Sequence, residues 1–467
     1  MKLTKIALSV IAVIGAVAVG GSWYTGKQVE EKYQQLVIQT NNQLKHINSQ
    51  YGSKVEIKDV QIESHFFSSD AKYRIEIDMI DGEKFDLIGN DTIHHGPLPL
   101  NRLAKFNFAP VMMSLENRLQ APEQFKKVVG EQLGSGTANI SYSGDAEGEF
   151  AISPLKFSNE KASLESTPIK MEYSYDKNGE NAVANVLLDS LDVKAEDSNF
   201  QIQGLSYDIQ TGDNQGYANL GLGKGSGKIK TIALQLQNGD GNSLITDIAF
   251  KGENTLKGDR VVSTGTLDAA SVNIGGIEFG KFNLDMALDF DAQLSDQVSV
   301  ALSDPKAFEN EQTGELALAL LAKSAKFHIN NVSFENSKGK FDLALLLNVA
   351  QFDAKAISDL NSVLKAVATS QFTSSVNRDY AEDIIRQIAM LKDKLSEEEA
   401  KTIAKQQVDA VFANAEENSL RVVDNNKVVV ELTVDNGKVN LNGRELSEDE
   451  LQMALFMIMM GVGSLGH

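Results

Sequence analysis

The chain has 467 residues, and its 44 lysine and arginine residues against 64 aspartate and glutamate residues leave a net charge of −20. It contains no cysteine, which excludes thiol nucleophiles, disulfide frameworks, iron–sulfur clusters and cysteine-ligated zinc. A composition with 42% hydrophobic and 23% charged residues predicts a folded protein with a sizeable core, and acidity without a basic stripe argues against a nucleic-acid partner.

The chain begins with the pattern of an export signal. Lys2 and Lys5 precede an uncharged, mostly apolar stretch over residues 6–25. As a helix, residues 6–24 cover about 28 Å, which is close to the ~30 Å hydrocarbon thickness of a bilayer. The stretch is therefore just long enough to span a membrane, and the two lysines predict a cytoplasmic N-terminus with the rest of the chain on the far side.

Two outcomes are open for this first segment. Residues 16–18 (Ala-Val-Ala) resemble a small-residue cleavage site, but the apolar run continues past them to Trp23 and Tyr24. These two aromatic residues are typical of a membrane interface. Because a cleaved signal normally ends its apolar run before the cut, we expect residues 1–24 to remain as a signal anchor and transmembrane helix, with a removed signal peptide as the alternative.

Residues 25–48 are predicted to form a juxtamembrane helix that continues the anchor. Apolar side chains recur there at the spacing of one helical face, at Val29, Tyr33, Leu36, Val37, Thr40, Leu44 and Ile47. This stripe either packs on the first domain of the same chain or pairs with a second copy, so a homodimer remains an alternative.

Residues 49–134 are expected to form an N-terminal α+β part. Apolar residues alternate with polar ones through Tyr73, Ile75 and Ile77, and an Asp81-Gly82 turn leads into a second alternating run. This pattern predicts an antiparallel hairpin.

Two adjacent histidines, His94 and His95, suggest a metal site at first sight. Neighbouring side chains in extended backbone point to opposite faces, and the following Gly96-Pro97 argues against a helix that would bring Asp91 to the same ion. We therefore expect a rigid structural connection here, with His95 bonded to peptide groups.

Residues 135–307 are predicted to form a long-stranded antiparallel part. The clearest alternation places five apolar residues on one face of a strand and polar or small residues on the other. The apolar five are Phe282, Leu284, Met286, Leu288 and Phe290. At Gly204 the phase of the alternation changes, which predicts a bulge.

The glycine-rich segment over residues 221–229 resembles a phosphate-binding loop only superficially. A Walker loop requires glycine where Leu222 stands and Ser or Thr where Ile229 stands, and no helical pattern follows. We expect a flexible connection between strands.

No catalytic motif is present in the sequence, and pairs of acids such as Asp189 and Asp192 are expected to lie on solvated strands. We therefore expect a non-enzymatic protein without cofactor or metal. A hydrolase site assembled only in the fold is the alternative, formed where carboxylates and serines meet His46, His65 or His328.

Residues 308–467 are predicted to contain mixed helices and strands. A capping box at Ser396 opens one helix, and alternating residues flank a turn at Asp435-Asn436-Gly437 that predicts a closing hairpin. A final helix over residues 453–465 carries no charge and is too short to span a bilayer. It is either buried or it contacts a partner or lipid through Met453, Phe456, Met457 and Met460.

Five short motifs occur in order along the chain: residues 22–27 (SWYTGK), 95–97 (HGP), 140–145 (ISYSGD), 404–408 (AKQQV) and 436–443 (NGKVNLNG). Together they resemble the YdgA family of Gram-negative bacteria over essentially the full length. The resemblance implies a protein anchored in the inner membrane, with most of the chain in the periplasm, and it supplies no catalytic residues.

The sequence thus predicts an α+β fold in which a long, meander-like antiparallel sheet carries C-terminal helices, preceded by a transmembrane helix and a juxtamembrane helix. The expected function is that of a non-enzymatic envelope protein that binds a lipid, a peptide or a protein partner on an apolar sheet face or groove. A periplasmic hydrolase is the alternative.

Overall fold

The computed structural model describes residues 54–447 except 79–83, 178–180, 214, 218, 237–240, 303–306, 308–309, 354–359, 416–419 and 436, and also residues 38, 41 and 450. The expected anchor with Trp23 and Tyr24, nearly all of the juxtamembrane helix, and the apolar helix with Met453, Phe456, Met457 and Met460 lie outside these residues. Within the described ranges, no helix combines the length and the apolar character needed to cross a membrane.

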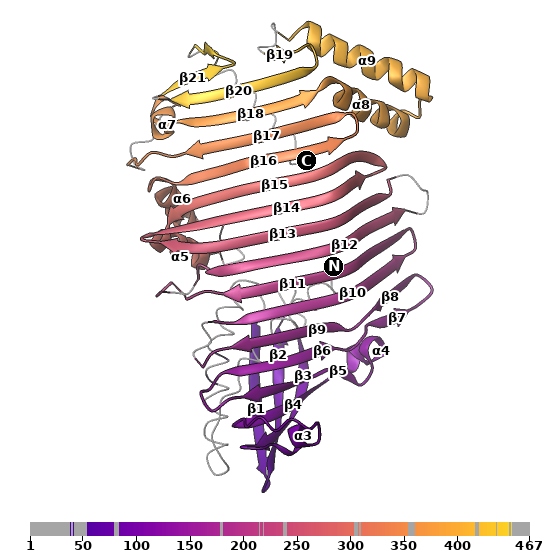
Figure 1. Ribbon diagram of the computed structural model, residues 1–467, viewed down its shortest axis with the longest axis vertical. Coiled ribbons are helices and arrows are strands. Elements are labelled where there is room, and N and C mark those ends of the chain that lie inside the picture. Colours follow the sequence, from indigo (N-terminus) through magenta and orange to yellow (C-terminus); the bar gives the residue numbers. More distant parts are fainter. Residues whose placement is uncertain are drawn as a thin grey trace. The chain divides into compact units, whose positions relative to one another are not determined.

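The described part of the chain contains 22 strands in an antiparallel sheet, and its longer helices lie in the C-terminal half (Figure 1). The predicted α+β class and the large antiparallel sheet are therefore confirmed. Contacts divide the chain into two compact units. The first holds Met1–Gly239, Thr246–Thr255 and Ser295–Leu316, and the second holds Asp240–Ile245, Leu256–Leu294 and Ala317–His467.

In the first unit, successive antiparallel pairings run β1-β2-β3-β4-β5-β6, and β6 then pairs with β9, which leads through β10 and β11 to β12. The elements are β1 (Lys54–Ser64), β2 (Ser68–Asp78), β3 (Lys84–His95), α3 (Leu100–Leu103), β4 (Met113–Gln120), η1 (Glu123–Phe125), α4 (Lys126–Val129), β5 (Gln132–Ile140), β6 (Ala146–Ile152), β7 (Lys156–Ser158), β8 (Ala162–Ser166), β9 (Ile169–Tyr175), β10 (Val183–Ala195), β11 (Ser198–Thr211) and β12 (Gly223–Leu236). The β7–β8 hairpin pairs with β10 through β8.

The early strands enclose the best-buried core. Ile75, Ile77 and Leu87 are fully buried, because the strict alternation of β2 and β3 turns one face of each strand inward. Phe125 of η1 packs on this core with its ring edge-on to Phe85, at a centroid distance of 5.4 Å. The predicted hairpin is confirmed as β2 and β3, which pair along their whole length.

The second unit contains long paired strands followed by helices. β14 (Arg260–Ile274) pairs with β15 (Ile277–Asp291), and further antiparallel pairings connect β16 (Lys326–Asn336), β17 (Gly339–Asn348), β18 (Ser370–Asn377) and β20 (Lys427–Asp435). The other elements are α7 (Leu360–Ala366), α8 (Arg378–Lys392), α9 (Glu397–Ala413), β19 (Arg421–Val423), β21 (Lys438–Leu441) and β22 (Arg444–Glu445). β13 (Ser243–Lys257), α5 (Ala292–Leu302) and α6 (Glu311–Leu321) complete the described elements.

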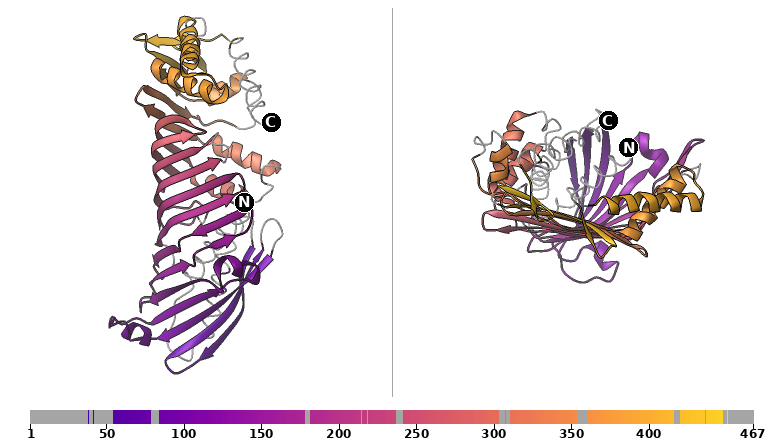
Figure 2. Two further views of the ribbon diagram at one scale, coloured as in Figure 1. Left: turned by 90° about the vertical axis from the view of Figure 1, so that its right-hand side faces the viewer. Right: turned by 90° about the horizontal axis from the view of Figure 1, so that it is seen from above.

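Helix α8 is the helix that docks on the strands of the second unit. The Tyr380 hydroxyl donates a hydrogen bond to the carbonyl of Phe279 in β15, at 3.1 Å. Helix α9 lies beside α8 (Figure 2), and the Arg378 guanidinium of α8 stacks over the ring of Phe412 at 3.9 Å. The capping box predicted at Ser396 is present and opens α9.

Two expectations about glycines are wrong. The glycine-rich segment is not a connection between strands: from Gly223 onward it forms β12, whose Gly225 and Gly227 leave room for the rings of Tyr207 and Phe250. A Cβ added at Gly225 would lie 2.7 Å from the Tyr207 hydroxyl oxygen, and one added at Gly227 would lie 2.3 Å from a ring carbon of Phe250. Aromatic rings packed over glycines fill the space that side chains would otherwise occupy.

The bulge predicted at Gly204 is also absent. Leu188 faces Leu205 and Ser190 faces Gln203, so the register between β10 and β11 is the same on both sides of the glycine. No residue is inserted. Gly204 instead adopts a φ of 63°, which glycine reaches without steric cost. The backbone of β11 therefore departs from extended geometry at this residue.

Candidate functional site

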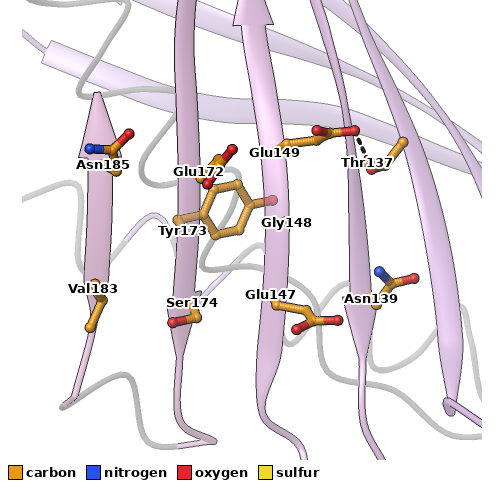
Figure 3. A pocket seen from close by; sticks show the side chains of 10 residues that line it. All are labelled: Thr137, Asn139, Glu147, Gly148, Glu149, Glu172, Tyr173, Ser174, Val183 and Asn185. Carbon is orange, nitrogen blue, oxygen red and sulfur yellow. Dashed lines mark hydrogen bonds between the residues drawn. The ribbon is translucent and has the colours of Figure 1, made fainter. Parts of the chain in front are cut away.

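A hollow of about 500 Å³ opens over β5, β6, β9 and β10 in the first unit, and Figure 3 shows the side chains around it. They are Thr137, Asn139, Glu147, Gly148, Glu149, Glu172, Tyr173, Ser174, Val183 and Asn185. The set is polar and contains three glutamates but no lysine or arginine. It was not anticipated from the sequence, because β6 and β9 become neighbours only through a long-range pairing.

Cross-strand register brings the glutamates together. Glu149 stands opposite Thr137 on one side and opposite Glu172 on the other, and its carboxylate accepts a hydrogen bond from the Thr137 hydroxyl at 3.4 Å. Like charges directly opposite each other repel, so this face disfavours anions and favours cationic groups. Across the part of the chain that the structure describes, no three His, Asp or Glu side chains are grouped as metal ligands require.

The Tyr173 ring packs on buried residues at the core side of these strands and fills the space where Gly148 has no side chain. It stands directly opposite Gly148, and a Cβ at Gly148 would come within 2.5 Å of the Tyr173 hydroxyl. Burial raises the pKa of Tyr173, and the nearby Tyr175 and Asp91 raise it further. The phenol therefore stays protonated at neutral pH and is not a general base.

A second candidate surface lies in the second unit, where apolar residues of β15, β16 and β17 stand in register. The four rows are Phe282–Phe334–Phe341, Leu284–Val332–Leu343, Met286–Ile329–Leu345 and Leu288–Phe327–Leu347. We call these twelve residues the apolar ladder. Each is partly exposed, in contrast to the fully buried core residues of β2 and β3.

The opposite face of the same strands is polar and internally bonded. Asn283 donates to the Asp268 carboxylate at 2.7 Å, and Asn330 donates to Asp285 at 3.0 Å. In the neighbouring strands Ser375 donates to Asp342 at 2.6 Å. Apolar and polar side chains of residues 282–290 therefore lie on opposite faces as predicted, but the polar face is partly buried rather than fully solvated, and its side chains have their own hydrogen-bond partners.

Of the adjacent histidines, His95 has a hydrogen-bond partner, whereas His94 Nε2 is buried and only approaches a carboxylate. His95 Nε2 lies 3.0 Å from the Ser69 hydroxyl, and His94 Nε2 lies 3.7 Å from a carboxylate oxygen of Glu116. Burial lowers the pKa of His95, a shift that a hydrogen bond to the backbone of Phe66 partly opposes. The two side chains therefore lie beside different neighbours, as expected for a structural connection. The Gly96–Pro97 peptide that follows is cis.

The described histidines suggested for a hydrolase each have a side-chain partner of their own. His65 pairs with Asp70 at 3.2 Å, while His328 lies 2.9 Å from the side-chain oxygen of Asn348 in the other unit. His46 lies outside the described residues. The Ser69–His95 contact has the residue types of a nucleophile and its base, but Ser69 has no exposed surface for a substrate to reach.

Comparison with known proteins shows one family over nearly the whole chain. The model for "Bacterial protein of unknown function (DUF945)" matches residues 1–449. Protein YdgA of Escherichia coli is 25% identical over 486 aligned residues, covering 96% of both chains. The uncharacterized protein YihF of the same species is 20% identical over 96% of this chain and 98% of its own. An uncharacterized protein of Haemophilus influenzae is 35% identical over 119 residues, which are 26% of this chain and 32% of that one. The resemblance to YdgA is thereby confirmed, and the chain belongs to the DUF945 family of bacterial proteins.

Proposed function

We propose that this protein is a non-enzymatic envelope protein, anchored in the inner membrane with most of its chain in the periplasm, that binds a lipid on the apolar ladder. The observation that supports this proposal is the apolar ladder. Three neighbouring strands present four apolar rows on one face, and all of these side chains keep partial exposure.

The dimensions of the ladder suit an acyl chain. From Phe282 to Leu288 the strand advances about 20 Å at ~3.3 Å per residue. One leaflet of the hydrocarbon core is only about 15 Å thick, so an extended acyl chain fits along the strand direction. Covering these partly exposed apolar side chains with a lipid chain removes apolar surface from water, at about 25 cal/mol per Å².

The polar face of the same strands is less suited to a lipid than the apolar ladder. Asp285 and Asp268 are engaged by Asn330 and Asn283, so charged groups are kept away from the apolar side. A ligand that is apolar along its length is therefore directed to the ladder rather than to the opposite face.

The test uses the full-length protein extracted in detergent, with the co-purifying lipids quantified by mass spectrometry. We expect a reproducible lipid content in the unaltered protein and a severalfold loss in a Met286→Gln, Leu345→Gln double variant, because two ladder positions become polar without gaining charge. The matched control is Asp285→Asn on the opposite face, which should retain the lipid.

Folding is followed by thermal melting of the same samples. Lipid retention by a folded double variant would contradict the proposal, as would an equal loss of lipid from the Asp285→Asn control.

A further inference from the structure

One end of the first unit exposes aromatic side chains on two turns that meet. The turn between β1 and β2 carries Phe66 and Phe67, which are 87% and 58% exposed. The connection between β3 and β4 carries Phe106 and Phe108, which are 84% and 65% exposed. We call these four residues the aromatic tip.

A backbone hydrogen bond ties the β1–β2 turn to the end of β3, where the β3–β4 connection begins. The amide of His95, at the start of the β3–β4 connection, donates to the carbonyl of Phe67 at 3.0 Å. The Ser69 hydroxyl of β2 lies 3.0 Å from His95 Nε2, so the strands next to the β1–β2 turn are also bonded at the end of β3 where the β3–β4 connection begins. The four aromatic residues are thus presented by one connected piece of structure.

The β3–β4 connection is internally braced. Buried Arg102 donates from Nη2 to the side-chain oxygen of Asn107 at 3.0 Å and to the carbonyl of Ala109 at 3.2 Å. These two bonds clamp the backbone on both sides of Phe108. Two exposed phenylalanines are therefore carried on a tied-down loop.

Phe106 is held in an unfavourable conformation. Its φ is 57°, a value at which a bulky aromatic residue is a genuine outlier and at which Gly or Asn is preferred. Its side chain receives little compensating burial, since 84% of it is exposed. An exposed phenylalanine in this conformation adds little burial to the fold, and such backbone outliers motivate a hypothesis of function.

The charge around the tip differs from that of the whole chain. Residues 96–112 include Arg102 and Lys105 and contain no acidic residue, although the chain has 64 acidic residues and a net charge of −20. Glu63 and Asp70 lie further back along β1 and β2, and Asp70 is paired with His65. Because this stretch carries no acidic residue, it does not repel an anionic surface as the rest of the chain would.

We propose that the aromatic tip inserts into the interfacial region of an anionic lipid bilayer. Exposed aromatic side chains on two adjoining turns enter the boundary between headgroups and acyl chains, which lies about 5–10 Å deep, while Lys105 faces the lipid phosphates. A lipid surface is favoured over a protein partner because exposed aromatic residues stand beside Lys105 in an acid-free stretch, the composition of a membrane-interface segment. This site is separate from the apolar ladder, and either proposal can fail without the other.

The test exploits the absence of cysteine, because each introduced cysteine is then the only thiol to label. Full-length Phe106→Cys protein is labelled with an environment-sensitive fluorophore and reconstituted into phosphatidylcholine vesicles with or without phosphatidylglycerol. The matched control is Ile88→Cys, an exposed apolar position on β3 that lies about 23 Å from His95 along the strand.

We expect the fluorophore at position 106 to shift to shorter wavelength and to be quenched severalfold more by brominated lipid than the one at position 88, most strongly with phosphatidylglycerol. Equal quenching at the two positions would overturn the proposal. A spectral shift that depends on protein concentration and shows no lipid quenching would also overturn it, in favour of self-association.

A second variant separates lipid contact from folding. With the fluorophore at Phe67→Cys, the added changes Phe106→Asn and Phe108→Asn should reduce lipid quenching severalfold while the melting temperature is unchanged or higher, because Asn tolerates the positive φ at position 106. Adding Ile88→Asn instead should leave the quenching unchanged. Unchanged quenching in the double asparagine variant would contradict insertion by the tip.

Discussion

Glycines that face aromatic rings across a strand pair recur in the first unit. Tyr73 stands opposite Gly89 and Tyr173 stands opposite Gly148, and each ring occupies the space in which a Cβ would lie. The buried Tyr73 also donates from its hydroxyl to Asp91 at 3.2 Å. At these two positions glycine is required because an aromatic ring lies close to its Cα, not because of its backbone conformation.

The variant Gly89→Ala tests this packing. An added Cβ would meet the Tyr73 ring at 2.1 Å, so we expect a destabilisation of roughly 1–3 kcal/mol from overpacking. Gly314→Ala in α6 is the control, because no atom lies near its Cβ position and the change should stabilise the helix by about 0.5–1 kcal/mol. Thermal melting should therefore shift in opposite directions, and two shifts of the same sign would contradict this account.

His95 predicts a pH dependence of stability. Burial lowers its pKa below the ordinary 6.5, so the unfolded chain binds the proton more readily than the folded one. The contribution of His95 is therefore fully present above pH 6.5 and is lost as the pH falls through the lowered folded-state pKa.

We expect His95→Gln to weaken the decline in melting temperature below pH 6.5 relative to the unaltered protein, since the titrating group is gone. His65→Gln, at an exposed position, is the control and should keep the decline. An unchanged pH profile for His95→Gln would show that the histidine does not couple folding to protonation.

At the scale of elements, the two faces of β15 differ in what a substitution does. Met286 lies within the apolar ladder, between Gly265 of β14 and Ile329 of β16, whereas Asp285 on the other face accepts a hydrogen bond from Asn330. One face therefore depends on apolar contact and the other on polar partners.

Met286→Leu should be tolerated, because the volume and apolar character are kept. Met286→Asp should lower stability by roughly 2 kcal/mol or more, since a carboxylate without a partner is placed among apolar side chains. Asp285→Asn should be nearly silent. The measurement is thermal melting of the three variants, and equal losses for Met286→Asp and Asp285→Asn would refute the assignment of faces.

Some helices and strands could be predicted from the local sequence, and others could not. The capping box at Ser396 and the hairpin that pairs Val434 with Val439 were predicted correctly, because each depends on residues a few positions apart. β18 was missed, since Phe372 and Val376 alone carry its apolar character among serines, threonine and polar amides. Helix α5 was also missed, because it follows β15 without a break.

At the scale of the whole molecule, the expected anchor remains a prediction. If residues 1–24 stay attached, the protein should remain with membranes after a high-salt wash, because its association rests on hydrophobic burial rather than on charge. N-terminal sequencing of the mature protein should then begin at or next to Met1. A sequence that begins at Val19 would show that the alternative, a removed signal peptide, is correct.

The sequence by itself determined the class of the fold, the one-sided character of residues 282–290, the N-cap of α9 and the family. The spacing of apolar residues, the residue types found in turns and short motifs are all properties of residues close together in the sequence. They can therefore be recognised without knowing which strands pair. The match over residues 1–449 extends this local information along the chain.

Only the tertiary structure decided which distant segments meet. It paired β6 with β9, which assembles the acidic hollow, and it joined the β1–β2 turn to the β3–β4 connection, which assembles the aromatic tip. The physical reason is that pairing between remote strands follows from the burial and packing of whole faces, whose free energy is shared among many residues and leaves no signature within a short stretch of sequence.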